Sequence, residues 1–260
     1  MTLLVAKVFL APLFVVAVSL AGRRWGMAVA GLLGGLPVVA GPILLAETLL
    51  HGRDFGADAA AATLLALAAL TAFVVAYGHL ARKTGPVLSV FGGWTTFLLV
   101  VLVLNEIQPP PVLSLLAVAV CFALGLRALP PAPPAPAPPT PPWWDLPARA
   151  LSALGLVLAL TAVSGTLGPH LSGLLAPFPI VTSVLAVFTH THGGVVQVTV
   201  LLRNFLVGFY GFATFCFALA LALHSLSTGA AFAIATVAAL AVQTTALALR
   251  WRLRPAPLTS

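Results

Sequence analysis

The fold class follows from residues 58–80, which read DAAAATLLALAALTAFVVAYGHL. No charged side chain follows Asp58 in this run, which is long enough to cross the roughly 30 Å hydrocarbon core of a bilayer as a helix. The run has no alternation of apolar and polar residues, so it does not resemble the strand of a membrane barrel. It therefore predicts a transmembrane helix.

The rest of the chain has the same character. Hydrophobic residues make up 61% of the 260 residues, charged residues only 7%, and the mean hydropathy is +1.13. Water-soluble domains carry about 25% charged residues, so this composition excludes a soluble globule. The sequence predicts an all-α polytopic membrane protein with about nine transmembrane helices. Besides 58–80, the expected spans are 3–22, 28–50, 86–105, 110–128, 147–166, 171–189, 196–223 and 228–249. Because Lys7 interrupts the first span and no cleavage site follows it, we expect a retained helix there and not a signal peptide.

Most basic residues lie between the expected spans, and their distribution predicts the orientation of the chain in the membrane. Nine basic side chains fall in segments on one side of the membrane, and only Lys7 and Arg53 fall on the other. The positive-inside rule therefore places the N-terminus outside and the C-terminus in the cytoplasm. Composition rich in Ala, Pro and Arg favours a bacterial inner (cytoplasmic) membrane. The net charge of +7 is explained by anionic lipid, so the lipid bilayer is an expected partner and nucleic acid is not. The nine residues are Arg23, Arg24, Arg82, Lys83, Arg127, Arg149, Arg250, Arg252 and Arg254.

The two halves of the chain align without a gap at a constant spacing of 142 residues, which we call the repeat offset. Gly31-Leu32-Leu33 aligns with Gly173-Leu174-Leu175, and Pro37 aligns with Pro179. An odd number of spans separates equivalent helices, so the halves have opposite orientations in the membrane. We predict one inverted-topology repeat in residues 1–105 and a second in 147–260 together with the basic tail. Residues 106–146 hold an unpaired connector span and a Pro-rich linker. Further matches are Lys7 with Arg149, Ser19 with Thr161, Gly26 with Gly168, Val39 with Val181, Gly52 with Gly194, Phe73 with Phe215 and Ala76 with Ala218.

Helix-breaking residues occur at equivalent positions in the two repeats. Residues 34–42 read GGLPVVAGP, and residues 176–183 read APFPIVTS. In a membrane, such breaks are tolerated where protein or a water-lined cavity satisfies the freed backbone groups. Paired interrupted helices in inverted repeats point to a midplane binding site. The predicted substrate-binding residues are Pro37, Gly41, Pro179, Thr182 and Ser183; a packing kink is the alternative.

Arg203, followed by Asn204, lies about two turns into the span at 196–223. Because a charged residue within a span is costly, it is a functional candidate by default. A guanidinium group offers paired donors that suit a carboxylate or a phosphate, so both residues are predicted to bind substrate. Alternatively, Arg203 binds backbone carbonyl groups that the nearby helix break leaves free.

Four further polar residues are candidates for ion coupling or gating. Lys7 and Glu47 are expected near the outer ends of the first two spans, where they could form an ion pair, and burial could let Glu47 carry a proton. Arg149 aligns with Lys7, and either side chain could instead snorkel to the interface. His190 is a candidate for a protonation switch. A metal site at His190 and His192 is disfavoured, because side chains two residues apart do not share a helix face.

Two other features carry less functional weight. Residues 130–142 form a Pro/Ala tract, which favours an extended, semi-rigid cytoplasmic linker before the interfacial residues Trp143 and Trp144. Cys121 and Cys216 both lie in apolar runs, so we expect neither a disulfide nor a thiolate metal site.

Function is the least determined property of the sequence. It contains no H-E-x-x-H, G-x-S-x-G or P-loop motif. The prediction is a secondary transporter, and not an enzyme, that moves a small anionic or zwitterionic solute by alternating access, driven by a proton or ion gradient and without a cofactor. Basic candidates within the spans outnumber acidic ones, which favours a negatively charged group on the solute. The basic residues are Lys7, Arg149 and Arg203, and the acidic ones are Glu47 and Glu106. Alternatives are a membrane-embedded lipid-processing enzyme or flippase, or a structural subunit of a membrane complex; a homo-oligomer is also compatible with the sequence.

Overall fold

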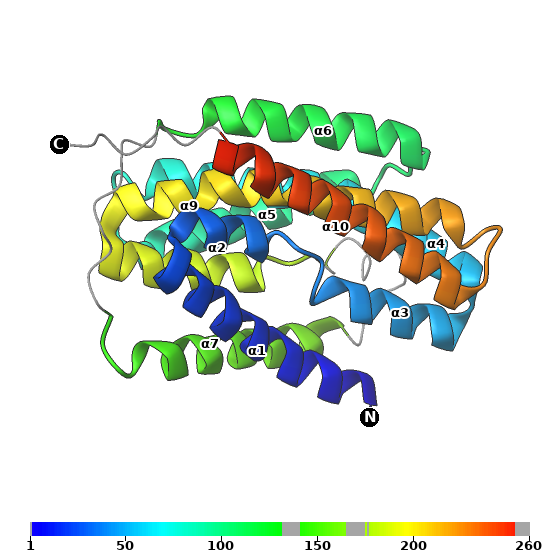
Figure 1. Ribbon diagram of the computed structural model, residues 1–260, viewed down its shortest axis with the longest axis horizontal. Helices are drawn as coiled ribbons and strands as arrows, with labels where there is room; N and C mark the ends of the chain where they lie inside the picture. The colour runs from blue at the N-terminus through cyan, green and yellow to red at the C-terminus, as the bar shows by residue number, and fades with distance from the viewer. Residues whose placement is uncertain (1, 132–140, 165–174, 176, 253–260) are drawn as a thin grey trace.

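The computed structural model describes residues 2–131, 141–164, 175 and 177–252, with the side chains of 2–8, 160–164 and 250–252 excepted. These residues form nine helices and no strand, which confirms the predicted all-α class for this part of the chain (Figure 1). Within the described part of the chain, five helices are long and apolar enough to cross a membrane, namely α4, α5, α6, α9 and α10. The chain is therefore a helical, membrane-embedded protein. Nine spans remain a prediction, because the second expected span is divided into two short helices and the seventh begins outside the described residues.

The first half of the chain contains α1 to α5. α1 (Thr2–Trp25) is followed by α2 (Met27–Gly34) and α3 (Ala40–His51), which together occupy the second expected span. α4 (Arg53–Leu80) and α5 (Pro86–Leu104) then form a helical hairpin. Proline is the first residue of α5, a position at which its missing N–H group removes no intrahelical hydrogen bond.

The remaining helices are α6 (Pro111–Ala128), α7 (Asp145–Ser164), α9 (Ile180–Ala222) and α10 (Thr228–Arg252). Gly194 interrupts α9 with φ 70° and ψ −172°, so the helix consists of a first segment (180–193) and a second segment (195–222). Gly52, between α3 and α4, has a similar backbone conformation, with φ 96° and ψ 170°. Only glycine adopts positive φ readily, and these two glycines are equivalent at the repeat offset.

The helices share two ends, which we call the linker end and the far end. At the linker end, His79 Nε2 of α4 lies 2.9 Å from the carbonyl oxygen of Ala128, and Arg23 of α1 contacts Asp145 of α7. At the far end, Arg53 Nη1 donates a 2.9 Å hydrogen bond to the carbonyl oxygen of Leu226, beyond α9. α1, α4, α6 and α10 therefore run toward the linker end, whereas α5, α7 and the second segment of α9 run away from it (Figure 1, linker end at the left).

Charge is distributed unevenly between the two ends. Four of the five acidic residues lie at the far end, and the fifth, Asp145, lies at the linker end. Basic residues show the opposite distribution, with Arg53 at the far end and most of the others at the linker end. The predicted orientation, with the N-terminus outside, is inferred from this uneven distribution of basic residues. The orientation itself stays a prediction. The far-end acids are Glu47, Asp54, Asp58 and Glu106, and the linker-end bases include Arg23, Arg24, Arg82, Lys83, Arg127 and Arg149.

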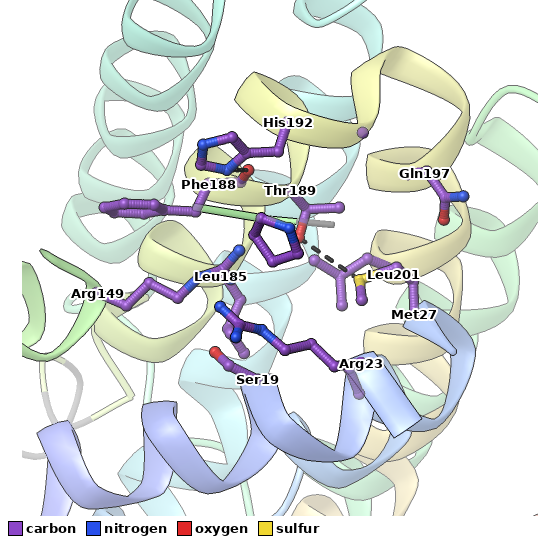
Figure 2. A pocket seen from close by; sticks show the side chains of 13 residues that line it. Ser19, Arg23, Met27, Arg149, Leu185, Phe188, Thr189, His192, Gln197 and Leu201 are labelled. Carbon is purple, nitrogen blue, oxygen red and sulfur yellow. Dashed lines mark hydrogen bonds between the residues drawn. The ribbon is translucent and has the colours of Figure 1, made fainter. Parts of the chain in front are cut away.

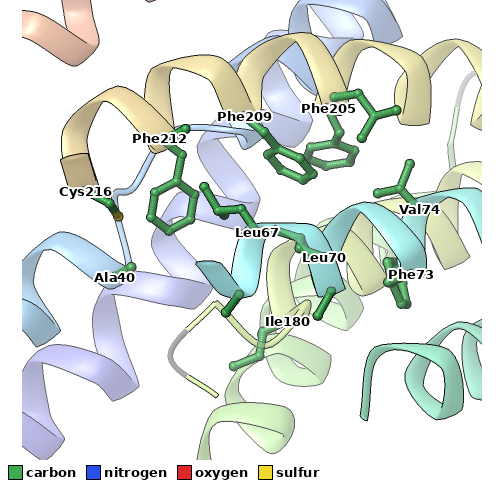
Figure 3. Close-up of a cluster of buried hydrophobic side chains, with 14 of the residues drawn as sticks. Ala40, Leu67, Leu70, Phe73, Val74, Ile180, Phe205, Phe209, Phe212 and Cys216 are labelled. Atoms are coloured by element: carbon green, nitrogen blue, oxygen red, sulfur yellow. The ribbon is translucent and has the colours of Figure 1, made fainter. Parts of the chain in front are cut away.

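The core lies between α4 and the second segment of α9, which run in opposite directions. Figure 3 shows Leu67 and Leu70 of α4 facing aromatic side chains of α9, and both leucines are buried, as are the labelled phenylalanines Phe205, Phe209 and Phe212. At the repeat offset, Leu67 is equivalent to Phe209, and Leu70 is equivalent to Phe212. α5, α6 and α10 instead expose many large apolar side chains, as expected of helices that face lipid.

The break between α2 and α3 occurs where the sequence predicts it, over residues 35–39. Gln243 of α10 donates a side-chain hydrogen bond to the carbonyl oxygen of Leu32, close to the end of α2. The second predicted break extends outside the described residues; at its described side, Trp94 of α5 donates a 2.8 Å hydrogen bond from Nε1 to Oγ of Ser183, in the first turn of α9. A lipid-facing helix from the opposite half of the chain thus supplies a polar contact near each break, as membrane burial requires.

Candidate functional site

A cavity of about 330 Å³ opens at the linker end between α1, α2, α7 and α9. Its volume lies near the lower limit of the range of roughly 300–1,000 Å³ that is typical of small-molecule sites. The lining is divided into a polar part and an apolar part. The polar side chains are Ser19, Arg23, Arg149, Thr189, His192 and Gln197, and the apolar ones include Met27, Ala30, Leu185, Phe188 and Leu201.

Asp145 organises the polar part of the cavity, although it is itself 0% exposed. Its Oδ2 accepts hydrogen bonds from Nη2 of Arg23 at 2.7 Å and from Nε of Arg149 at 2.8 Å. Its Oδ1 lies 3.2 Å from Nδ1 of His192, which is also 3.0 Å from the carbonyl oxygen of Phe188. One carboxylate therefore joins α1, α7 and α9.

Local sequence explains why these charges meet. Asp145 is the first residue of α7, where the helix dipole favours a negative charge, and Arg149 follows one turn later. Arg23 lies in the last turn of α1, where the dipole favours a positive charge. The start of α7 and the end of α1 therefore attract one another once the two helices pack together.

The ionisation of Asp145 is determined by opposing effects. Burial alone raises the pKa of its carboxyl group. The hydrogen bond and charge of Arg149, the hydrogen bond of Arg23 and the charge of His192 act in the opposite direction and outweigh burial, so the pKa lies below its ordinary value. Asp145 is thus a stable anion that holds two cations in place.

The two arginines keep donors directed at the cavity. Figure 2 shows the guanidinium groups of Arg23 and Arg149 and the hydroxyl of Ser19 pointing into the same space. Arg149 is buried, and its guanidinium carbon lies 5.1 Å from the centroid of the Phe188 ring, a cation–π distance. Ser19 is buried, and its Oγ has no hydrogen-bond partner within the described part of the chain. These donors could bind the oxygens of a carboxylate or a phosphate. Among the described residues, no group of three or more His, Cys, Asp or Glu side chains could hold a metal ion.

Arg149 is the one predicted site residue with a described side chain that lines this cavity. It does not snorkel away from the protein, because Asp145 and Phe188 hold it inside. Arg203 lies elsewhere. Its Nη1 donates to the carbonyl oxygens of three residues at the end of α6 and the start of the linker, at 3.1, 3.1 and 3.2 Å. These acceptors are Leu126, Leu129 and Pro130.

The geometry around Arg203 matches the alternative in which it binds backbone carbonyl groups, although these belong to α6 and not to the helix break. Asn204 donates from Nδ2 to the carbonyl oxygen of Val200 at 2.7 Å. The last carbonyl groups of a helix lack intrahelical partners, so Arg203 caps the end of α6. Substrate binding by Arg203 and Asn204 stays a prediction.

The five residues predicted at the helix breaks lie deeper than the cavity and do not line it. The cavity extends to Ala30 in α2 and Leu185 in α9, each within about two turns of a break. Ser183 accepts the hydrogen bond from Trp94, and Gly41 packs beside Phe215. Pro37 is half-buried in the 35–39 connection, Pro179 precedes α9, and Thr182 is buried in its first turn. A binding role for these residues remains a prediction.

The predicted coupling residues are separated in space. Glu47 lies at the far end, with Oε2 3.1 Å from Nδ1 of His51 one turn later, and the Lys7 side chain lies outside the described residues. His190 Nδ1 lies 3.4 Å from the buried hydroxyl of Tyr77 in α4. His192 points into the cavity instead, so the two histidines occupy different faces of α9, as their spacing predicts.

Sequence reasoning missed Asp145, Arg23 and Ser19. Arg203 lies deep within a predicted span, where a charge is costly, whereas Arg23 and Asp145 lie just outside the predicted spans, where charges are common. A signal was present, because Asp145 is the one acid in the segments that the charge pattern places inside, and Arg149 follows it at a spacing of four. That spacing brings two side chains together on a helix.

No protein-family model, curated protein or solved structure matches this chain. Function must therefore be inferred from the arrangement of the helices and the chemistry of the cavity.

Proposed function

We propose that the protein is a secondary transporter that moves a small anionic or zwitterionic solute across the membrane by alternating access. The observation that carries this proposal is the position of the cavity. α1 and α2 of the first half of the chain line one side of it, and α7 and α9 of the second half line the other. A site between two halves can open to either face of the membrane when the halves move relative to one another.

The proposed halves are inverted repeats, and several independent features support this relation. At the repeat offset, α1 corresponds to α7, α4 to the second segment of α9, and α5 to α10. The two helices of each pair run in opposite directions, as inverted topology requires. The ends of the helices also match at the repeat offset. Leu80, the last residue of α4, is equivalent to Ala222, the last residue of α9. Pro86, the first residue of α5, is equivalent to Thr228, the first residue of α10.

The Asp145 cluster would act as a gate in this mechanism. Among the three side chains that contact Asp145, Arg23 belongs to the first half, whereas Arg149 and His192 belong to the second. Movement of the halves would break the contact with Arg23 and preserve the other two. A proton or ion gradient would drive the cycle, with the linker end in the cytoplasm.

Transport can be tested in proteoliposomes with charge movement recorded on a solid-supported membrane. A panel of carboxylates, phosphate esters and amino acids would be applied with and without a proton gradient. We expect a saturable current for at least one anionic or zwitterionic member, and loss of that current in Arg149→Gln. The matched control Arg82→Gln, at the linker end but outside the cavity, should transport normally.

Access to the cavity gives an independent measurement. A single cysteine at Gly193, in a chain with Cys121 and Cys216 replaced by alanine, should react with an impermeant maleimide from either side of the membrane during turnover. Reaction from one side under every condition, together with no current for the whole panel, would contradict alternating access.

A second candidate is a flippase or another lipid-handling protein. The cavity lies at one end of the bundle, and Trp144 packs 5.7 Å from His192, centroid to centroid, with Trp143 exposed beside it. Tryptophan is enriched at the depth of lipid headgroups. Movement of fluorescent phospholipid between leaflets, without current for soluble solutes, would favour this candidate.

A further inference from the structure

We propose that the cavity at the linker end binds an amphiphilic monoanion: a single oxyanion head, carboxylate or phosphodiester, attached to an apolar chain. Arg23, Arg149 and Ser19 bind the head, and the apolar part of the cavity receives the chain. This inference names the substrate class of the proposed transporter and rests on that function for its biological meaning. Binding itself can be measured without transport.

The charge of the cluster selects a monoanion. Arg23 and Arg149 contribute two positive charges, and Asp145 neutralises one of them. The sum of these three charges is one positive charge beside the cavity. A single negative charge on the ligand balances it, whereas a dianion would leave excess negative charge in a poorly solvated site.

The hydrogen-bond donors select an oxyanion. The Oγ of Ser19 is buried in the wall and has no protein partner among the residues that the structure describes. A buried hydroxyl without a partner is costly, and a bound acceptor would remove this cost. Arg149 uses Nε for Asp145, so the outer nitrogens of its guanidinium group face the cavity (Figure 2).

The lining disfavours a zwitterion or a cation. Asp145 contacts two of the lining arginines, but it is fully buried and does not itself line the space. An ammonium group would therefore meet guanidinium groups and no exposed carboxylate. Phosphate or a small hydrophilic acid would also leave the apolar wall in contact with water.

That apolar wall is formed by Met27 and Ala30 from α2 and by Leu185 and Leu201 from α9. Since a water molecule occupies about 30 Å³ in the liquid, 330 Å³ accommodates on the order of ten non-hydrogen atoms. An oxyanion head with a short alkyl or aryl chain has this size; one end of a longer lipid would fill the same space.

The test uses the purified full-length chain in nanodiscs of phosphatidylcholine, with hexanoate as the probe and calorimetry as the readout. We expect hexanoate to bind at least tenfold more tightly than hexanamide, hexylamine or the dianion adipate. Arg23→Gln should weaken hexanoate binding by about tenfold or more, and Arg24→Gln, which changes the exposed neighbouring arginine, should leave it unchanged. Ser19→Ala should weaken it several-fold without removing any contact of Asp145, so this variant remains informative if Arg23→Gln fails to fold.

The natural monoanion could be a lipid or a soluble organic acid, and competition by an anionic lipid distinguishes the two. In nanodiscs that contain phosphatidylglycerol, a lipid ligand would raise the apparent Kd of hexanoate in proportion to the lipid fraction, and Ser19→Ala would reduce that competition. A soluble organic acid as the natural ligand would leave the Kd unchanged. Either result supports the monoanion site.

Equal affinity for hexanoate and hexanamide, or equal effects of Arg23→Gln and Arg24→Gln together with none from Ser19→Ala, would overturn the proposal. Transport of a zwitterion by a chain that does not bind hexanoate would overturn the substrate class alone. Hexanoate binding without uptake of any solute into liposomes would overturn the transport function alone.

Discussion

The two ends of the molecule treat charge in different ways. At the linker end, one carboxylate is fully buried, and three side chains from three helices contact it. At the far end, the ion pairs are short-range or loose, and their side chains are partly or largely exposed. Glu47 pairs with His51 one turn away on the same helix, and Asp54, 97% exposed on its side chain, lies 4.0 Å from His224.

The buried charges at the linker end are therefore expected to contribute to the stability of the fold, and the exposed charges at the far end to contribute little. Exposed ion pairs contribute about 0–1 kcal/mol, because water already solvates both partners. A buried charge has lost that solvation, so each of its partners matters and loss of one leaves another unpaired. The Asp145 cluster also faces a cavity, whereas the side chains of the far-end pairs are partly or largely exposed. Stability and ligand binding are therefore expected to depend on the linker end.

Replacement of Asp145 by asparagine should have the largest effect. Arg23 and Arg149 would lose their common counter-ion, and breaking a buried ion pair costs about 3–5 kcal/mol. We expect a large fall in the melting temperature of the purified protein, measured by the loss of tryptophan fluorescence on heating.

Asp54→Asn is the matched control for this measurement, because it makes the same chemical change at the exposed far end. Its melting temperature should equal that of the wild type. If Asp54→Asn destabilised the protein as much as Asp145→Asn, the distinction between the two ends would be wrong.

Arg203→Met should have the second largest effect. The methionine keeps an apolar stem but cannot donate to the carbonyl oxygens at the end of α6. Loss of hydrogen bonds from a charged donor costs about 1–3 kcal/mol, so we expect a moderate fall in melting temperature with unchanged hexanoate binding. The control is Arg127→Met, which removes an exposed arginine from the same region.

The same variant decides between the two roles considered for Arg203. Loss of ligand binding at unchanged stability would instead support the substrate-binding role predicted from its depth in the span. Loss of stability at unchanged binding would support the capping role.

The sequence predicts the helical class, the membrane location and the break near Pro37, because each depends on local composition. An apolar run long enough to span a bilayer has few alternatives to a helix. Glycine at 52 and at 194 similarly marks two junctions with positive φ, which side chains with a Cβ rarely adopt.

The sequence does not predict the cavity, because its walls come from segments far apart in the chain. Arg23 and Asp145 are 122 residues apart, and although each has the charge that its helix end favours, the sequence does not show that α1 and α7 pack together. The depth of Arg203 in its span indicated a functional role, but the carbonyl groups that it binds become available only where α6 ends beside α9. The location of the cavity depends on which helices pack together, and patterns of single residues do not show this.

Acidification should weaken the linker end selectively. Because the pKa of Asp145 is lowered in the folded protein, its contribution to stability is fully present above the ordinary pKa of aspartate, about 3.9. That contribution is lost as the pH falls below this value and through the lowered pKa. The melting temperature of the wild type should therefore fall more steeply below about pH 4 than that of Asp145→Asn, which has no proton to gain at this position. Parallel curves for the two proteins would mean that Asp145 is not held as an anion. The effect at pH 4 is smaller than that of the substitution, because little of the carboxylate is protonated there.

Glu47→Gln should have the smallest effect, and it tests the far end directly. Glu47 is 29% exposed on its side chain and His51 is 51% exposed, so water competes for both partners. We expect a change in the free energy of unfolding of less than about 1 kcal/mol, and a coupling energy near zero in a double-mutant cycle with His51→Gln. Proton-dependent transport that disappears in Glu47→Gln while stability is preserved would show that the far end also carries function. In that case the second gate of an alternating-access cycle would lie at this carboxylate, opposite the gate proposed at Asp145.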